Sequence, residues 1–394
     1  MHFSRREFVA GVSSAASLAM AGLAGEIRAD AAEADGGTKK VARILFNENP
    51  LGPSPKALAA IADAGQQFAR YPLGESGKLS TALRRANGLP FTEPTAGLSL
   101  RPADPPPGNM DLILGVGSSE VLRAAAWAYC SGGGNVVEAY PGYAAIGGTA
   151  ARIPGAQVDR KMIPLTADYR LDSKAMIDAI DSDTKLVVIC NPNNPTGTTI
   201  DMTEIESIAM AAPDDALVFV DEAYIEFASD PKRASALEFA KTRENVLVTR
   251  TFSKIYGLAG LRVGYGIGSR DVIERLKPHM LGGLAFNMPG ILAAQAAIED
   301  QDHLQATLAL NEKIHESWRR SFKGFGFEMS PSVTCFGWVN VGQDCSPLVQ
   351  YLAGRDVLIS GGQRWDLPNY VRISIGTEEE NDRLLAGIKS FLAG

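Results

Sequence analysis

The fold of this chain is decided by one stretch, Leu186-Val187-Val188-Ile189-Cys190-Asn191-Pro192-Asn193-Asn194-Pro195-Thr196-Gly197. Its first five residues form an apolar run, which is typical of a strand that is buried on both faces. The two prolines and three asparagines that follow predict a rigid turn, which presents side-chain amides at the end of that strand. The stretch therefore predicts a buried strand that ends in a polar site.

Apolar, strand-like runs alternate with helical stretches on both sides of this motif. β-Branched residues and Gly/Pro punctuation indicate strands at 111–116, 135–139, 185–190, 216–221, 245–250 and 262–267. The intervening lengths suit crossover helices, so we expect an α/β fold whose central sheet is mostly parallel and flanked by helices. After about residue 292 a long helix and shorter strands near 335–341 and 370–375 predict a smaller α+β domain.

The domain organisation follows from the same patterns. We expect a helix from about Pro55, and the Pro-rich stretch 89–109 predicts a surface insertion. The expected parts are a signal peptide at 1–34, an N-terminal segment of the small domain at 35–70, a large domain at 71–290 and a C-terminal small domain at 291–394.

Charged groups follow two more of the expected strands. Asp221 ends the run 216–220, and Lys254 stands in Thr251-Phe252-Ser253-Lys254 after the strand at 245–250. A lysine is usually a surface residue, but this one follows a buried strand and two hydroxyl side chains. Because strand ends meet at one edge of a parallel sheet, we expect an amine, a carboxylate and amides to lie together.

An anion site is expected near the first strand of the sheet. Leu112-Ile113-Leu114-Gly115-Val116-Gly117-Ser118-Ser119-Glu120 reads as a strand, a glycine turn and a helix start. Free backbone N–H groups at a helix start suit a phosphate dianion. Taken alone, the pattern is also typical of an ordinary helix cap.

Together these groups closely resemble the fold-type I, class I/II aminotransferases, and most of all their histidinol-phosphate aminotransferase-like branch. The resemblance spans roughly residues 45–392. It implies pyridoxal 5'-phosphate as the cofactor, because an amine, a carboxylate, amides and a phosphate site are what this cofactor needs. It also implies exchange of an amino group between an amino acid and a 2-oxo acid.

The resemblance assigns three groups to the reacting end of the cofactor. Lys254 would carry it as a Schiff base and move the substrate proton. Asp221 would keep the ring nitrogen protonated, because a nearby opposite charge favours the charged form. Asn194 and Tyr224 would share the phenolate oxygen of the cofactor. Lys254, Asp221 and Tyr224 are thus the expected catalytic residues.

The resemblance also assigns the phosphate contacts. Ser118 and Ser119 lie at the glycine-serine turn, and Ser253 and Arg262 would grip the phosphate from the other side. Thr251 is a weaker candidate for the same task. The charge-assisted guanidinium contact is the strongest of these anchors.

Three further residues carry over from the family. Tyr143 would stack on the cofactor ring. Arg372, in Tyr370-Val371-Arg372-Ile373-Ser374, would clamp the anionic group of the substrate beside Asn194. Tyr71 resembles the tyrosine that reaches the phosphate of the neighbouring subunit's cofactor, so we expect a homodimer with shared sites.

One departure from the family bears on the substrate. Histidinol-phosphate enzymes usually carry another arginine where this chain has Ser360-Gly361-Gly362, although Arg364 lies close by. Histidinol phosphate is therefore a weaker candidate than an amino acid. Two other functions stay open: a decarboxylase or other amino-acid lyase on the same fold, and a non-catalytic binding protein. Retention of Lys254 and Asp221 disfavours the second.

The N-terminus predicts export to the periplasm. Ser4-Arg5-Arg6-Glu7-Phe8 is a twin-arginine signature, and a small-residue apolar run follows at 9–25. Ala29-Asp30-Ala31 and Ala32-Glu33-Ala34 both resemble cleavage sites. We expect the twin-arginine machinery to carry the folded protein, and the run is too short to favour a permanent membrane span.

Composition excludes several classes of function. The 394 residues carry a net charge of −7, which argues against a nucleic-acid binder. The four cysteines match no zinc spacing and the four histidines form no H-E-x-x-H pair, so no metal site is expected. The pattern leaves open a disulfide between Cys335 and Cys345.

Overall fold

The structure is a computed structural model that describes residues 41–92 and 108–394. Residues 41–394 form one compact unit. The predicted signal peptide lies outside the described residues, as does most of the predicted insertion at 89–109. No helix within the described ranges is long and apolar enough to cross a membrane. The predicted domain limits at 70 and 290 stay predictions.

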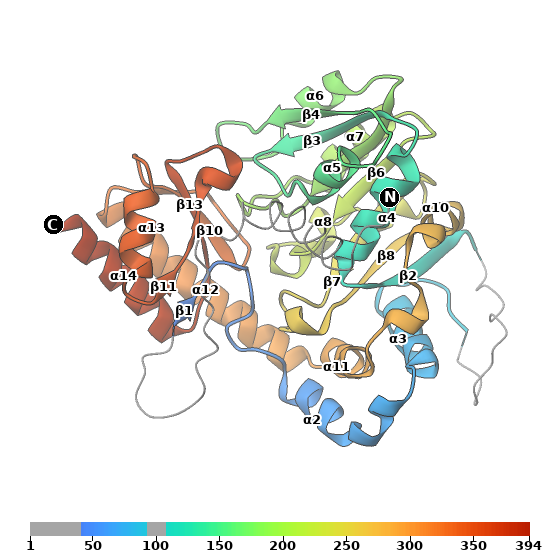
Figure 1. The fold of residues 1–394 in the computed structure, drawn as a ribbon, viewed down its shortest axis with the longest axis horizontal. Coiled ribbons are helices and arrows are strands. Elements are labelled where there is room, and N and C mark those ends of the chain that lie inside the picture. The colour runs from blue at the N-terminus through green and yellow to red at the C-terminus, as the bar shows by residue number, and fades with distance from the viewer. Residues whose placement is uncertain (1–40, 93–107) are drawn as a thin grey trace, which may run out of the picture. The chain divides into compact units, whose positions relative to one another are not determined.

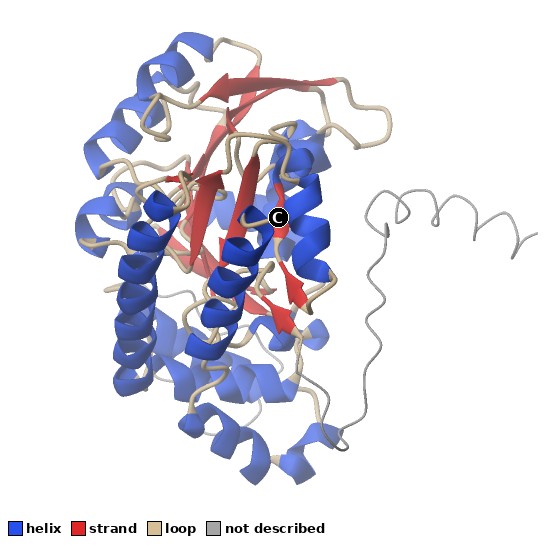
Figure 2. Ribbon diagram, turned by 90° about the vertical axis from the view of Figure 1, so that its left-hand side faces the viewer, coloured by secondary structure: helices blue, strands red, loops and turns tan. Residues whose placement is uncertain are grey.

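A seven-stranded sheet forms the centre of the fold (Figures 1 and 2). All neighbouring strands are parallel except β8, which runs antiparallel to both of its neighbours, β2 and β7. In spatial order the strands are β2 (Met110–Val116), β8 (Val263–Ser269), β7 (Val246–Thr251), β6 (Leu217–Asp221), β5 (Thr184–Cys190), β3 (Gly134–Tyr140) and β4 (Val158–Pro164).

The six predicted strands and the mostly parallel α/β sheet are confirmed. The sequence patterns missed β4, which lies at the edge of the sheet. None of its residues is buried, and Asp159, Arg160 and Lys161 interrupt the apolar run. An edge strand buries too little surface to show the continuous apolar signal of a central strand.

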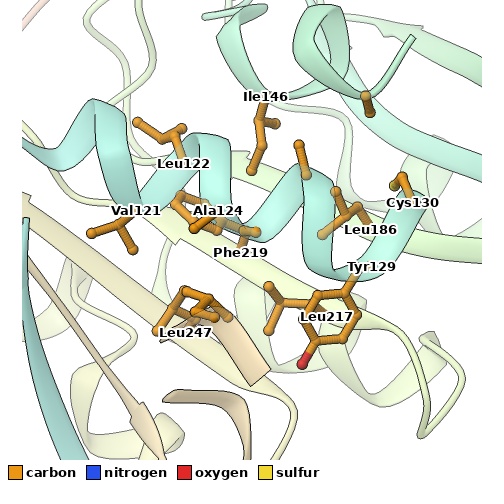
Figure 3. Packing of buried hydrophobic residues seen from close by; sticks show 14 of the residues in the cluster. Val121, Leu122, Ala124, Tyr129, Cys130, Ile146, Leu186, Leu217, Phe219 and Leu247 are labelled. Atoms are coloured by element: carbon orange, nitrogen blue, oxygen red, sulfur yellow. The ribbon is translucent and has the colours of Figure 1, made fainter. Parts of the chain in front are cut away.

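Helices cover both faces of the sheet because its central strands are apolar on both faces. In β5, Leu186 and Val188 join the cluster beneath α4 (Ser118–Cys130), while Val187 and Ile189 join the cluster on the opposite face. Figure 3 shows α4 lying across the strands, with Val121 and Ala124 among the side chains between them. Burying each aliphatic side chain of this size stabilises the fold by about 1.5–3 kcal/mol.

Short helices complete the two layers. On the α4 side lie α5 (Ala145–Ala150) and α10 (Arg270–Leu276), and the opposite cluster includes residues of α6 (Ser173–Ala179), α7 (Met202–Ala211) and α9 (Leu237–Ala240). Single helical turns link these elements: η2 (Ile225–Phe227), α8 (Pro231–Ala234), η3 (Ala259–Leu261), η4 (Lys277–His279) and η5 (Gly283–Ala285).

A second sheet of four antiparallel strands follows in the C-terminal region. Its order is β12 (Ser360–Gly361), β13 (Tyr370–Ser374), β10 (Phe336–Asn340) and β9 (Glu328–Met329). The helices α12 (Gln301–Gly324), α13 (Ser346–Ala353) and α14 (Glu378–Leu392) pack around it, with Trp318 of α12 fully buried. The strands predicted near 335–341 and 370–375 are confirmed.

The N-terminal segment joins this second region. β1 (Ala42–Arg43) pairs in parallel with β11 (Val357–Leu358), so the two chain regions lie side by side in Figure 1. The chain then crosses to α2 (Pro55–Asp63), η1 (Gly65–Ala69) and α3 (Leu73–Ala86). Ser54 caps α2, since its Oγ accepts from the Ala57 amide at 3.2 Å, and the helix predicted from Pro55 is confirmed.

Two further details differ from the simplest interpretation of the sequence. The helical stretch after about residue 292 consists of α11 (Met288–Ile298) and α12, because the backbone at Asp300 leaves the helical region (φ −92°, ψ 73°). All four cysteines are buried and free, so Cys335 and Cys345 form no disulfide.

Candidate active site

The predicted site residues meet at the carboxyl ends of β5, β6 and β7, which are neighbours in the sheet. Asp221 ends β6 and lies opposite Cys190 of β5 and Thr249 of β7. The amide of Asn191, the first residue after β5, donates to the Asp221 carbonyl oxygen at 2.9 Å. Adjacent parallel strands therefore deliver the amide turn, the carboxylate and the lysine to one place.

The three asparagines of the turn have different tasks. Asn191 Nδ2 donates to the carbonyl oxygens of Ile200 and Ala234 at 3.0 and 2.7 Å, which holds the turn to its surroundings. Asn193 Nδ2 donates within the turn, to Thr196 Oγ1 at 2.9 Å. Only Asn194 turns to the predicted substrate residue, Arg372, as described below.

Asp221 and its neighbour Glu222 point in opposite directions, as successive strand residues do. Asp221 is 3% exposed, and its Oδ1 accepts from the Ala223 amide at 3.2 Å and from Thr249 Oγ1 at 3.4 Å. Burial raises the pKa of Asp221 to about 6, although both hydrogen bonds act against this rise. The negative charge of Glu222 is paired on the side away from the site, because Arg250 donates two hydrogen bonds to its Oε2 at 2.8 and 2.9 Å.

Lys254 follows β7 and lies over the ring of Tyr224, with Nζ 5.6 Å from the ring centroid. Its Nζ donates to the carbonyl oxygen of Phe46 at 3.2 Å. Burial lowers the pKa of Lys254, and the positive charge of Arg372 acts in the same direction. A lowered pKa increases the fraction of neutral amine, which is the form that attacks an aldehyde.

Tyr224 is held by a residue whose role the sequence did not reveal. Its hydroxyl accepts from Asn47 Nδ2 at 2.9 Å, and the Asn47 amide donates to Ser374 Oγ at 2.7 Å. Asn47 has a left-handed backbone, with φ 57°. Asparagine adopts the left-handed backbone region more readily than most residues. This preference was the local feature of the sequence that agreed with the backbone observed at Asn47.

Arg372 lies in β13, yet its guanidinium reaches the turn after β5. Nη1 donates to Asn194 Oδ1 at 2.8 Å and Nη2 donates to the Leu45 carbonyl oxygen at 2.7 Å. Its buried Nε has no hydrogen-bond partner among the residues that the structure describes. Burial lowers the pKa of Arg372 to about 10. The side chain is therefore fixed in place with donor capacity unused.

The predicted phosphate contacts gather at the start of α4. Arg262 Nη1 lies 3.5 Å from Ser253 Oγ, and its backbone oxygen accepts from the Gly117 amide at 3.0 Å. Gly117 has φ 72°, and a Cβ there would lie 2.5 Å from Arg262 Nη2, so only glycine fits. Ser118 is buried at the first turn of α4.

The remaining predicted residues differ in their surroundings. Thr251 Oγ1 donates to Ser253 Oγ at 3.0 Å, so it positions that serine. Ser119 is exposed on the first turn of α4. Tyr143 is 37% exposed, and burial together with the charge of Asp221 raises its pKa. Tyr71 is 69% exposed, with no hydrogen bond to any residue within the described ranges.

The assembled groups fit pyridoxal phosphate. The N-terminus of α4 with Ser253 and Arg262 suits a phosphate dianion. Buried Asp221 suits a protonated ring nitrogen, and Lys254 supplies an amine. A separate cavity of about 540 Å³ opens at the opposite edge of the sheet, beside Asp214 and Arg243, and none of the predicted site residues lines it.

Comparison with known proteins agrees with this geometry. Residues 44–388 match the family of aminotransferases of class I and II. The histidinol-phosphate aminotransferase 2 of Pseudomonas fluorescens is 35% identical over 367 residues, which cover 92% of each chain. The histidinol-phosphate aminotransferase of Sinorhizobium meliloti, solved in complex with pyridoxal-5'-phosphate, is 26% identical and superposes with a TM-score of 0.77, covering 94% of this chain and 99% of that one.

A third relative shares the fold alone. The L-threonine-O-3-phosphate decarboxylase of Porphyromonas gingivalis is 20% identical, with a TM-score of 0.70 over 89% of this chain and 99% of that one. The family match and the 35% identical relative both extend over almost all of the described residues. The chain therefore belongs to the class I and II aminotransferases, a family of pyridoxal-phosphate-dependent transferases.

Proposed function

We propose that this chain is an amino-acid aminotransferase in which Arg372 binds the α-carboxylate of the amino acid and of the 2-oxo acid. The observation that carries this proposal is the fixed guanidinium of Arg372, with Nη1 on Asn194 and a buried Nε without a partner in the described ranges. A planar guanidinium binds a carboxylate through two parallel hydrogen bonds, which also orients it.

The site residues divide the chemistry between them. Pyridoxal phosphate, when bound, supplies a conjugated ring that draws electrons from the substrate Cα. Lys254 removes the Cα proton, and burial, which lowers its pKa, favours the neutral amine needed for this task. Asp221 supplies a buried negative charge that favours a protonated ring nitrogen. Asn194 and Tyr224 would hold the phenolate oxygen, and Ser118, Ser253 and Arg262 the phosphate.

Borohydride reduction tests the role of Lys254. It should trap the cofactor on the peptide that contains residue 254, and Lys254→Ala should lose both this adduct and turnover. Lys174→Ala is the matched control, because Lys174 is an exposed lysine paired with Asp178. A trapped adduct or unchanged turnover in Lys254→Ala would refute the assignment.

A panel of amino donors with pyruvate and 2-oxoglutarate tests the reaction type. Formation of a new amino acid from the acceptor supports transamination. Release of carbon dioxide without consumption of the acceptor would instead identify an amino-acid decarboxylase.

Histidinol phosphate is the second candidate substrate, because relatives at 35% and 34% identity carry the name histidinol-phosphate aminotransferase. This chain has Ser360-Gly361-Gly362 where histidinol-phosphate enzymes usually carry another arginine, although Arg364 lies close by, and this departure weakens the candidate. Histidinol phosphate belongs in the same donor panel. Turnover of it far above that of any α-amino acid would replace our proposed substrate class.

We further propose export through the twin-arginine pathway to the periplasm, on the basis of Arg5, Arg6 and the apolar run at 9–25. Export of the folded protein would allow cofactor loading in the cytoplasm. Replacement of both arginines by lysine should leave the protein in the cytoplasmic fraction. An unchanged periplasmic yield would exclude this route.

We also propose a homodimer with shared sites. Several apolar side chains near Tyr71 are exposed, among them Leu73, Leu281 and Leu284. Leu73 and the 281–284 loop are adjacent, since a Cβ on Gly283 would lie 3.6 Å from Leu73 Cδ2. An exposed apolar group of this kind is typical of a protein–protein interface.

Subunit complementation tests the sharing. Tyr71→Phe alone should weaken cofactor binding, and Lys254→Ala alone should be inactive. A mixed dimer of the two variants would regain one site with an intact Lys254 and an intact Tyr71. Failure of refolded mixtures to regain normal cofactor affinity would exclude a contribution of Tyr71 across the interface.

A further inference from the structure

A stripe of polar side chains runs along one side of α12. Its four members recur at intervals of four residues, which brings them to the same side of the helix: His303, Thr307, Asn311 and His315. The last three of them are buried. Core-facing positions of a helix are usually apolar, so buried polar groups at this spacing need partners.

The first half of the stripe binds the N-terminal segment. His303 Nε2 donates to the Gly52 carbonyl oxygen at 3.1 Å, and Thr307 Oγ1 accepts from Asn49 Nδ2 at 3.1 Å. Asn49 Nδ2 also donates to the carbonyl oxygen of Ile255, the residue after the site lysine, at 2.7 Å. The stripe therefore ties the N-terminal segment to the chain beside that lysine.

The second half of the stripe holds the loop before β10, residues 330–335, which we call the junction loop. Asn311 Nδ2 donates to the Val333 carbonyl oxygen at 3.4 Å, and His315 Nε2 donates to that of Thr334 at 2.7 Å. Burial lowers the pKa of His315 to about 4, so the ring is neutral at neutral pH. Because a carbonyl oxygen only accepts, the proton of the neutral ring lies on Nε2. The buried Nδ1 has no hydrogen-bond partner in the described part of the chain.

The junction loop connects α12 to the active site. Its Val333 amide donates to the Gly197 carbonyl oxygen at 3.0 Å, in the turn after β5. Cys335 Sγ donates to the Asn47 carbonyl oxygen at 3.8 Å, and its side chain packs with Tyr224, the ring over which the site lysine lies. A shift of the junction loop would therefore move a wall of the pocket that holds this lysine.

We propose that His315 is a positioning residue for the active site, which holds the junction loop against the turn after β5 and so keeps water out of the pocket of Lys254. The inference goes beyond the proposed reaction, although it rests on the role given there to the lysine. Burial is the main cause of the lowered pKa of Lys254. A loosened junction loop would admit water, and the pKa of Lys254 would rise towards its ordinary value.

The alternative is a histidine that only fills space beside Trp318, with the two ring centroids 5.8 Å apart. Leucine fills a similar volume without a polar atom, so on this view His315→Leu would leave the site unchanged. Glutamine can donate to the Thr334 carbonyl oxygen in place of Nε2, so on our view His315→Gln retains the function. Ile314→Val is the matched control, because Ile314 is the adjacent residue of α12 and packs in the core of the C-terminal region.

Hydrogen exchange of the cofactor-free protein measures the state of the junction loop. In His315→Leu the Val333 amide should exchange about tenfold faster than in the wild type, since the loop loses a buried hydrogen bond. His315→Gln should restore most of the protection, and Ile314→Val should leave it unchanged. Equal exchange in His315→Leu and the wild type would overturn the inference. If His315→Leu does not fold, Asn311→Leu removes the neighbouring contact and decides by the same comparison.

The second readout is the pH dependence of covalent attachment of pyridoxal to the cofactor-free protein, in which the amine nitrogen replaces the aldehyde oxygen and water leaves. Only the neutral amine of Lys254 attacks, so the pH at half-maximal rate follows its pKa. This pH should rise by about 0.5–1 in His315→Leu and keep the wild-type value in His315→Gln and Ile314→Val. These variants keep the groups whose charges act on the lysine, which are those of Cys335, Arg372, Glu48 and Asp221.

The two readouts together decide the inference. Faster exchange of the junction loop without a rise in this pH would leave His315 a purely structural residue and would overturn the inference, as would an equal rise in Ile314→Val. Absence of attachment in the wild type would instead overturn the role of Lys254 and with it the proposed function. The exchange comparison would then still decide whether His315 holds the junction loop.

Discussion

Replacing Asp221 by asparagine should make the cofactor-free protein more stable, by an amount that depends on pH. Burial raises the pKa of Asp221 from an ordinary 3.8 to about 6. Asparagine has the same shape and its oxygen can still accept from the Ala223 amide and Thr249 Oγ1. The substitution therefore removes a buried charge and keeps the hydrogen bonds.

The sign and size of the effect follow from the two pKa values. As pH rises from 3.8 to 6, the unfolded state releases its proton before the folded state does, so ionisation lowers the stability of the wild type. The loss is about 1 kcal/mol near pH 4.5 and reaches a plateau of about 3 kcal/mol above pH 7. Asp221→Asn lacks this titration, so its advantage over the wild type should grow by about 2 kcal/mol across this window.

Urea unfolding of the cofactor-free proteins from pH 4.5 to 8 measures this difference. Asp344→Asn is the control, because hydrogen bonds from Ser346 lower the pKa of the exposed Asp344. Its titration lies below the window, so it should show no such growth. A constant difference between Asp221→Asn and the wild type, or a variant less stable at every pH, would refute the assignment of a buried, charge-strained carboxylate. With cofactor bound the order should reverse, because only aspartate offers a charge to the ring nitrogen.

Three other variants probe the frame of the site. Gly197→Ala should lower the free energy of unfolding by about 2–4 kcal/mol, since the backbone has φ 71° and a Cβ would lie 1.9 Å from a serine hydroxyl. Gly155→Ala is the control, because this residue has φ 80° but open space around it. It should lower the free energy of unfolding by only about 1 kcal/mol in the same urea titration. Asn47→Ala loses the hydrogen bond to the Tyr224 hydroxyl, so it should lower the free energy of unfolding by about 1–3 kcal/mol and should also lower kcat. Asn47→Gly removes the backbone strain at φ 57° but also lacks the hydrogen bond, so its kcat should stay low. Arg262→Gln should raise the Kd for pyridoxal phosphate about 10–100-fold in an absorbance titration, and an unchanged Kd would exclude Arg262 from the phosphate site.

Much of the central sheet could be predicted because its strands are buried on both faces. The runs 186–190 and 217–220 are apolar without interruption and are followed by Asn191 and Asp221, and the shorter apolar run 246–248 is followed by Thr249. Since the strands are parallel neighbours, their polar ends had to meet. The antiparallel direction of β8 could not be predicted from the sequence, because a strand buried on both faces has the same composition in either direction.

The contacts made by the rest of the chain were not visible in the sequence. Asn47 reaches Tyr224, and Leu45 accepts from Arg372, across more than 170 and 320 positions respectively. Arg364 and Arg372 converge on one indole only because η6 (Gly362–Trp365) packs against the loop after β3. Local patterns of hydrophobicity do not predict contacts between side chains that are so far apart in the sequence.

The amino-acid sequence by itself determined the order of strands and helices, the motifs at the strand ends, and hence the family and its cofactor. These features depend on local apolar periodicity and on short polar turns, which the chain carries in consecutive residues. Only the tertiary structure decided which carboxylate is buried with a raised pKa, which asparagine faces the site, and which guanidinium groups lie together. Those properties depend on burial and on distances between side chains, and both arise only when segments far apart in the chain pack against each other.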